Sequence, residues 1–180
     1  MTFTPAPLEG ILVIEPPVHA DPRGRFIETY RRDLFAKNGV TSEFVQDNQS
    51  RSAKGVLRGL HYQKAPFGQA KIVRVAYGSV FDVVVDLRRA SPTFGRSFSV
   101  TLSAGNAKML FIPAGFAHGF LSLEDDTEFV YKVSAFHSPD HERGVRWNDP
   151  SLGIRWPQPE GEIYVSERDR ALPLLAQADL

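Results

Sequence analysis

The chain has 180 residues, a length that suits a single domain able to bury a sizeable core. Its 21 Lys and Arg residues balance 21 Asp and Glu residues, so the formal net charge is zero and gives no reason to expect nucleic acid or a membrane as a partner. It has no cysteine, which excludes disulfides, thiolate metal sites and a cysteine nucleophile.

The N-terminal sequence, MTFTPAPLEG, has neither the basic region nor the apolar run of a signal peptide. The most apolar stretch, 80–87, is interrupted by Asp82 and Asp86, so no segment that crosses a bilayer is expected. A cytoplasmic location is the resulting expectation.

The first element predicted along the chain is a short helix within 29–39, TYRRDLFAKNG, which Gly39 would end. The next is a hairpin over 72–88, IVRVAYGSVFDVVVDLR, with its turn at Gly78. Glycine suits the turn because it adopts positive φ without steric cost.

Two more strand-rich segments follow. The segment 97–113, SFSVTLSAGNAKMLFIP, predicts a second hairpin with its turn at Gly105 and Asn106, and 127–136 predicts a further strand. Many short strands at this spacing favour an all-β sandwich or barrel.

The C-terminal part differs in composition from the strand-rich region. It is rich in proline from Asp149 onward and is expected to wrap the sheet surface, with one capped turn at 166–169 before Pro173. The whole chain, 1–180, is thus expected to form one domain with an N-terminal arm and a C-terminal wrapping tail.

Two polar residues stand three apart in an apolar strand at residues 55–63, GVLRGLHYQ. Because side chains alternate along a strand, regular pleating would send Arg58 and His61 to opposite faces. They can share one cavity only if alternation fails between them. Gly59 is the natural place for the β-bulge that this requires.

Other charged or titratable residues also interrupt the apolar runs: Lys71, Arg74, Asp82, Asp86, His118, Tyr131 and Lys132. Burying charge is costly unless it is paired, so several such side chains entering a sheet interior indicate a polar cavity. Purely structural interpretations also exist. His61 could be a satisfied core histidine, Tyr131 a packing residue, and Ser166 with Asp169 a helix capping box.

A metal site is not expected. The run 113–118, PAGFAH, resembles the second histidine motif of cupin metal sites. Such sites also need an earlier histidine cluster, and the matching place here reads His61-Tyr62-Gln63. With five histidines in the chain, a set of three or four nitrogen and oxygen ligands is not visible.

Several runs together resemble the dTDP-4-dehydrorhamnose 3,5-epimerase family and span most of the chain. They are DPRGRFIE (21–28), FVQDNQSRSAKGVLRGLHYQ (44–63), QAKIVRVAYGSVFDVVVDLRRASPTFG (69–95), FIPAGFAHGFLSL (111–123), EFVYK (128–132), HERGVRWNDP (141–150) and SERD (166–169). The resemblance implies a cupin jelly roll, a homodimer, and no metal or other cofactor. It also implies a nucleotide-sugar substrate, dTDP-4-keto-6-deoxyglucose, and a role in supplying dTDP-rhamnose for polysaccharide synthesis.

Carried over residue by residue, the resemblance implies four catalytic residues. His61 would be the general base, Asp169 its carboxylate partner, Tyr131 the acid on the other side of the sugar, and Lys71 the cation beside the C4 keto oxygen. Epimerisation next to a ketone removes a proton from one face and returns one to the other, through an enolate that a nearby cation stabilises. Imidazole titrates near neutral pH, and a carboxylate on its far nitrogen fixes its tautomer.

The resemblance also implies substrate-binding residues. Arg58 and His118 are similar to contacts of the diphosphate and sugar, and Gln46 and Asn48 match a run that binds nucleoside and phosphate. The residues that match a nucleotide-reaching N-terminal segment, which in this family often crosses the dimer, are Arg23, Phe26 and Glu28.

One departure from the family pattern leaves alternatives open. His137 stands where a tyrosine is common near the site. Inversion at C3 or C5 alone, on a related sugar, is therefore the first alternative. A sugar-nucleotide-binding cupin without catalysis and a metal-dependent cupin oxygenase or isomerase are the others. The presence of base, carboxylate, acid and lysine together favours the epimerase, because binding alone needs no proton transfer.

Overall fold

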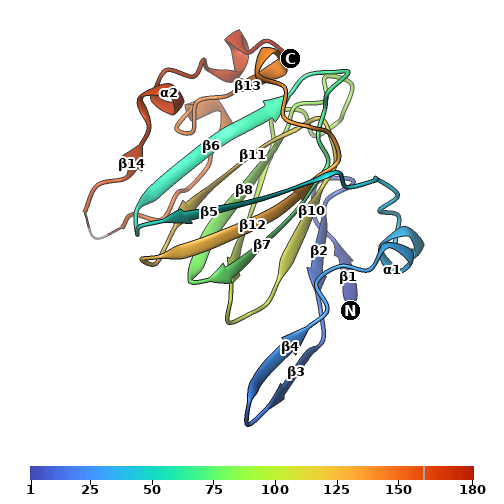
Figure 1. Ribbon diagram of the computed structural model, residues 1–180. Helices are drawn as coiled ribbons and strands as arrows, with labels where there is room; N and C mark the ends of the chain where they lie inside the picture. The colour runs from blue at the N-terminus through green and yellow to red at the C-terminus, as the bar shows by residue number, and fades with distance from the viewer. Residues whose placement is uncertain (160) are drawn as a thin grey trace.

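The computed structural model describes residues 1–159 and 161–180, which form two large, mostly antiparallel sheets and a two-stranded arm. The first sheet contains, in spatial order, β1 (Thr2–Pro5), β2 (Leu12–Glu15), β10 (Met109–Ile112), β7 (Lys71–Tyr77), β12 (Thr127–Val133) and β5 (Gln46–Ser52). The second contains β13 (Glu142–Gly144), β6 (Val56–Gln63), β11 (Phe116–Ser122), β8 (Ser79–Asp86) and β9 (Ser97–Ser103), with β14 (Tyr164–Val165) parallel to β6. The sheets face each other as the layers of a jelly roll, which confirms the expected all-β fold (Figure 1).

The two predicted hairpins are wrong. The chain does turn at Gly78, with a φ of 74°, but β7 and β8 on either side of it belong to different sheets. The same holds for β9 and β10 on either side of Gly105 and Asn106. The alternation of apolar and polar residues identifies a strand and the turn that follows it. Which strand it pairs with depends on strands far away in the sequence.

The main core lies between the sheets and is built by the alternation of strand side chains. On β8, Val80 and Val84 face the opposite sheet, whereas Val83 and Val85 join a second core on the outer face. Phe129 from β12 and Phe120 from β11 stack across the interior, with ring centroids 4.2 Å apart. Asp82 therefore points inward, among apolar side chains, on the same face as Val80.

The proline-rich C-terminal segment covers the outer face of the second sheet (Figure 1). Leu152, Trp156, Val165 and Ala178 pack there against side chains of β6, β8 and β11. The short helices of this half are η1 (Pro139–His141), η2 (Pro150–Leu152), α2 (Glu167–Arg170) and η3 (Leu175–Gln177). Because this segment runs beside the edge of β6, it can bring side chains to the ends of that strand.

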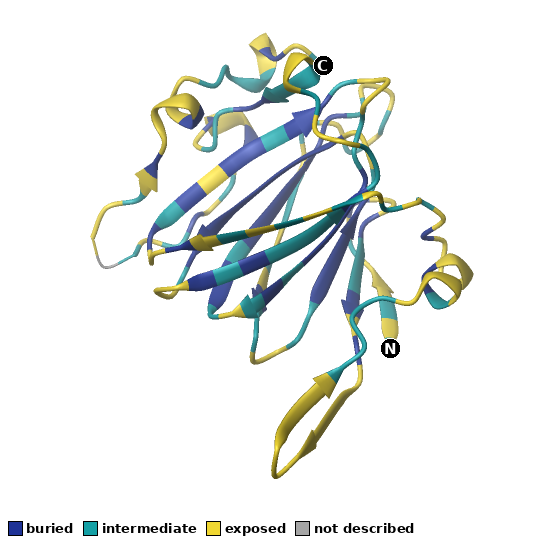
Figure 2. Ribbon diagram, in the orientation of Figure 1, coloured by how far each residue is buried: buried dark blue, intermediate teal, exposed yellow. Residues whose placement is uncertain are grey.

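The helix expected within 29–39 is confirmed as α1 (Arg32–Lys37), which the left-handed Gly39 follows. Its Phe35 is fully buried against the outer face of the first sheet. Between β2 and α1, β3 (Val18–Asp21) and β4 (Gly24–Ile27) form a hairpin that projects away from the sheets (Figure 1). Most of this hairpin is exposed (Figure 2).

Candidate active site

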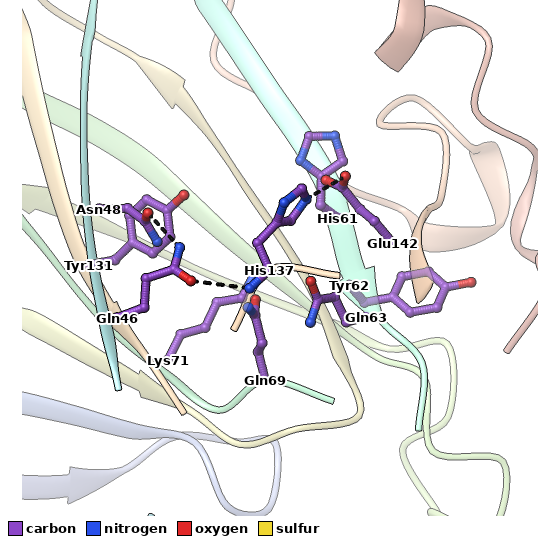
Figure 3. A pocket seen from close by; sticks show the side chains of 10 residues that line it. All are labelled: Gln46, Asn48, His61, Tyr62, Gln63, Gln69, Lys71, Tyr131, His137 and Glu142. Carbon is purple, nitrogen blue, oxygen red and sulfur yellow. Dashed lines mark hydrogen bonds and ion pairs between the residues drawn. The ribbon is translucent and has the colours of Figure 1, made fainter. Parts of the chain in front are cut away.

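A cavity of about 300 Å³ opens between the sheets, at the end where polar side chains replace the apolar core. Its lining residues are Gln46, Asn48, His61, Tyr62, Gln63, Gln69, Lys71, Tyr131, His137 and Glu142 (Figure 3). Few of these side chains are apolar, and they converge from both sheets. A concave site of this size with converging polar groups suits a small polar ligand.

His61 on β6 is paired with a carboxylate from the C-terminal segment. Its Nε2 lies 2.7 Å from Oδ1 of Asp169, whose other oxygen accepts the backbone N–H of Gly59 at 3.1 Å. Burial alone would raise the pKa of Asp169, but the hydrogen bond and charge of His61, the backbone N–H of Gly59 and the charge of Arg168 together lower that pKa below its usual value. An ionised Asp169 keeps a proton on Nε2, which leaves Nδ1 as the nitrogen able to accept a proton.

The local sequence explains how Asp169 reaches His61. Ser166 is the N-cap of α2, and its hydroxyl oxygen accepts the backbone N–H of Asp169 at 3.1 Å. The Asp169 side chain is directed to His61 and Gly59 rather than back to the cap residue, so half of a capping box forms. The backbone N–H of Asp169 thus belongs to the helix cap, and its carboxylate is left for the catalytic role that the sequence predicts.

A β-bulge in β6 answers the question raised by Arg58 and His61. From one to the other β6 advances three residues while its partner β11 advances two. Gly59 has a φ of 127°, and a Cβ on it would lie 2.6 Å from the Cα of Gly119 on β11. The predicted bulge at Gly59 is confirmed, and only glycine fits there because both the backbone angle and the approach of β11 exclude a side chain.

Tyr131 and Lys71 enter the cavity from the other sheet. Tyr131, on β12, lies across the cavity from His61, and Lys71, on β7, lies on the floor between them (Figure 3). Burial, and to a smaller extent the Glu142 carboxylate, raises the pKa of Tyr131, so its phenol stays protonated at neutral pH. Burial lowers the pKa of Lys71 to about 8, a value at which most of the amine is still charged at neutral pH.

Gln46 and Asn48 on β5, both predicted to bind substrate, also line the cavity. The amide of Gln46 donates to Oδ1 of Asn48 at 2.9 Å, and its oxygen accepts the backbone N–H of His137 at 3.1 Å. Gln46 thus connects β5 to the chain beyond β12, next to Tyr131 (Figure 3). Amide groups in this position can bind polar parts of a ligand.

Arg58 and His118 lie close to the cavity but outside its lining. The Arg58 guanidinium is exposed and donates to the hydroxyl of Ser52 at 3.1 Å, and its charge acts on Tyr131. His118 is buried, with Nε2 2.9 Å from Oδ2 of Asp82. The exposed Arg58 can therefore contact a ligand that extends out of the cavity, whereas the buried His118 is held by Asp82.

The three predicted residues of the N-terminal arm are far from this cavity. Arg23 forms an ion pair with Asp21 at 2.6 Å, and Phe26 has 68% of its surface exposed. Glu28 lies just beyond β4, within reach of Arg31 at 3.7 Å. Within one chain, the structure brings none of these residues to the other candidates.

Sequence reasoning missed Gln63, Gln69 and Glu142. Both glutamines flank the loop after β6, where Gln63 donates to the carbonyl of Phe67 at 2.7 Å. Glu142 lies in β13, and its carboxylate is 3.1 Å from Nε2 of His137. The signal for Glu142 was weak because a single acidic residue in a polar run resembles an ordinary surface position.

Within the described part of the chain, no group of three or more His, Asp or Glu side chains is placed to hold a metal ion. The described residues also include no helix that is long and apolar enough to cross a membrane.

Comparison with known proteins places the chain in one family. The sequence pattern of the dTDP-4-dehydrorhamnose 3,5-epimerase family matches residues 5–177. A protein of that name from Pseudomonas aeruginosa is 49% identical over 180 residues, covering 99% of this chain and 98% of the relative.

Solved structures agree with the sequence match. A 3,5-epimerase from Legionella pneumophila, in complex with dTDP-4-keto-L-rhamnose, superposes with a TM-score of 0.94 at 42% identity, covering 98% of this chain and 93% of that one. A 3'-monoepimerase from Streptomyces bikiniensis, in complex with dTDP-quinovose, gives 0.89 at 40% identity, covering 96% and 87%. The jelly roll described above is therefore of the cupin type, and the chain belongs to the dTDP-4-dehydrorhamnose 3,5-epimerase family.

Proposed function

We propose that this protein is an isomerase that inverts C3 and C5 of dTDP-4-keto-6-deoxyglucose and so supplies dTDP-rhamnose synthesis. The observation that supports this most directly is the arrangement of His61 and Tyr131 on opposite walls of one cavity, with Lys71 between them (Figure 3). A proton can be taken from one face of a sugar ring in this cavity and another returned to the opposite face.

In the proposed reaction, Nδ1 of His61 takes the proton from the carbon next to the C4 ketone. The bonding electrons move to the C4 oxygen, and the Lys71 ammonium stabilises the enolate that forms. Asp169 stabilises the imidazolium through its bond to Nε2. The Tyr131 phenol then gives its proton to the other face of the carbon, and solvent exchanges protons with both groups before the second carbon reacts.

No electron leaves or enters the substrate in this sequence, so the reaction requires no redox cofactor. A metal is not required either, because the Lys71 ammonium provides the positive charge that the enolate oxygen needs. The substrate diphosphate is proposed to extend toward Arg58, whose planar guanidinium suits phosphate oxygens. His118 supports the sugar site through Asp82.

The decisive experiment is proton NMR of dTDP-4-keto-6-deoxyglucose with the protein in heavy water. Loss of the signals of both H3 and H5, with formation of dTDP-4-keto-L-rhamnose, supports double inversion. Exchange at one carbon alone supports the alternative, a single-carbon epimerase, which is the activity named for the similar Streptomyces bikiniensis protein. Tight binding of dTDP-sugar without any exchange would leave a non-catalytic binding protein.

We also propose that the chain forms a homodimer in which the arm of one protomer reaches the nucleotide bound by the other. The support is that Phe26 and its neighbours are exposed on a projecting hairpin (Figure 2). In this proposal Arg23, Phe26 and Glu28 act on the partner's substrate. Sedimentation equilibrium should give twice the chain mass of 20.1 kDa, and the chain mass itself would contradict the proposal.

The remaining proposals concern the domain and its location. We regard residues 1–180 as one cupin domain with an N-terminal arm and a C-terminal tail, since the tail packs on the second sheet. We expect a cytoplasmic location, because nucleotide sugars are made from cytoplasmic nucleotides. Limited proteolysis that releases no stable fragment, and fractionation with a cytoplasmic marker, are the corresponding tests.

A further inference from the structure

Two glutamine side chains at the cavity, Gln63 and Gln69, have no role in the proposed reaction. Gln63 is the last residue of β6, two positions after His61, so both side chains lie on the same face of the strand. It is only 7% exposed, and Gln69 is half-buried just before β7. A buried amide needs partners for its donor hydrogens and its acceptor oxygen. The partners therefore indicate what these two side chains do.

Gln63 holds the backbone on both sides of His137. Its amide nitrogen donates to the carbonyl of Phe136 at 3.2 Å, and its oxygen accepts the N–H of Ser138 at 2.8 Å. The same nitrogen also donates to the carbonyl of Phe67 at 2.7 Å. The side chain thus takes the place of a peptide group from a neighbouring strand, in a part of the chain that lies outside any strand.

Two more glutamines bond to the same short segment, residues 135–138, which we call the rim segment. Gln69 donates to the carbonyl of Ala135 at 2.8 Å, and the oxygen of Gln46 on the facing sheet accepts the N–H of His137 at 3.1 Å. Each of the four consecutive residues therefore has one backbone group bonded to a glutamine that lines the cavity. The three side chains, Gln46, Gln63 and Gln69, form a glutamine cradle (Figure 3).

The rim segment places His137 at the mouth of the cavity. The His137 side chain lines the cavity and is 53% exposed (Figure 3). Its backbone is bonded to β5 of the first sheet, and its imidazole is bonded to β13 of the second. A residue bonded to both sheets at this point limits the space that a sugar can occupy between them.

Amide side chains suit this position for a chemical reason. They donate and accept hydrogen bonds, so one amide can satisfy both a carbonyl and an N–H of the backbone. They also neither gain nor lose a proton near neutral pH. The glutamine cradle can therefore stay unchanged while the base and the acid on the two walls exchange protons with a substrate.

We propose that Gln63 and Gln69 are positioning residues, which hold the rim segment so that His137 fixes the orientation of the sugar between the base and the acid. This role rests on the proposed function, because the sugar must present opposite faces to two groups. Neither glutamine exchanges protons with the substrate. Both act through His137, and a displacement of about 1 Å in such a site can cost about a hundredfold in rate.

Gln63→Met keeps the length of the side chain and removes its hydrogen bonds. Turnover is measured per folded site, with the number of sites taken from the stoichiometry of dTDP binding in calorimetry, so that unfolded protein does not lower kcat. We expect kcat to fall about tenfold, with changes of less than about twofold in KM and in the affinity for dTDP.

Gln69→Met removes one hydrogen bond where Gln63→Met removes three, so kcat should fall less, by about threefold. It tests the same role at a less buried position, where a loss of folding is not expected. The matched control is Gln49→Met, at an exposed glutamine of β5 bonded to Glu128, which should change neither kcat nor KM.

A second readout does not depend on turnover. Hydrogen exchange of backbone amides, followed by NMR, should be about tenfold faster at Ser138 in Gln63→Met, whereas the amides of β12 should keep their rates. An unchanged rate at Ser138 would overturn the glutamine cradle. Faster exchange with an unchanged kcat per site would overturn the positioning role. A wild-type protein that inverts no carbon would instead overturn the proposed function, whatever the exchange at Ser138.

Discussion

The two walls of the cavity hold their polar side chains in different ways. On the β6 wall, His61 is bonded to Asp169, which also accepts the N–H of Gly59, and Glu142 is bonded to Arg168. On the opposite wall, the side chains of Tyr131 and Lys71 form no hydrogen bond with any other described residue, although both are largely buried.

This contrast fits the different tasks proposed for the two walls. A base must present one nitrogen at a fixed angle and keep its tautomer, so hydrogen bonds made before substrate arrives are useful. An acid and an enolate-stabilising cation must instead offer their polar atoms to the substrate, and internal partners would compete. Substitutions on the β6 wall should therefore change both stability and activity. Substitutions of Tyr131 or Lys71 on the opposite wall should change activity alone.

The largest effect is expected for His61→Ala. Loss of the base should reduce turnover by about a hundred- to ten-thousand-fold, the contribution typical of a positioned general base. Uptake of solvent deuterium at both carbons should fall together with turnover, as measured by proton NMR. Binding of dTDP, measured by calorimetry, serves as the control and should be nearly unchanged. Persistent deuterium uptake would assign the base to another residue.

Tyr131→Phe should affect the second half of the reaction. Without the phenol the enolate is reprotonated from the His61 side, so net inversion should fall about a hundredfold while exchange of substrate hydrogen continues. The free energy of unfolding should stay within about 0.5 kcal/mol of the wild type, because the removed hydroxyl has no partner in the described structure. Tyr77→Phe, at an exposed tyrosine on β7, is the control. Full net turnover in Tyr131→Phe would refute the assignment of the acid.

Asp169→Asn should reduce both activity and stability, as expected for a residue that holds the β6 wall in place. The amide can donate to His61 and favour the wrong tautomer, so we expect kcat to fall about a hundredfold with a smaller change in KM. The pKa of Asp169 is below its usual value in the folded protein. Its ionised form therefore stabilises the fold above the ordinary carboxyl pKa, and this contribution is lost as the pH falls.

Chemical denaturation at two pH values tests this direction of the pH dependence of stability. The variant should be less stable than the wild type by about 1–3 kcal/mol at neutral pH, and the difference should shrink below about pH 4. The control is Asp33→Asn, at an exposed residue of α1. A difference that is constant with pH would mean that the charge of Asp169 does not contribute.

The parts of the site that could be predicted are those with a local physical cause. Gly59 marks the bulge because only glycine tolerates that backbone, and the Ser166 cap predicts the turn that carries Asp169. Reaching His61 from residue 169 required the tail to fold back, which the sequence allowed but did not determine.

The parts that could not be predicted depend on residues far apart in the chain. The turn at Gly78 was recognisable, but whether β7 pairs with β8 or crosses to the other sheet depends on β10, β11 and β12. Glu142 becomes part of the cavity only because β13 joins the edge of β6 and α2 brings Arg168 beside it. No local pattern contains that information.

The smallest effect is expected for Ser166→Ala. This variant tests whether α2 must be held in place for Asp169 to position His61 on the β6 wall. The hydroxyl accepts the N–H of Asp169, and loss of such a cap costs about 1 kcal/mol of stability. Because α2 carries both Asp169 and Arg168, kcat should also fall, by about two- to fivefold. Ser99→Ala, at an exposed serine on β9, should change neither quantity. Lower stability with unchanged kcat would show that Asp169 is held by His61 and Gly59 alone, independently of its helix.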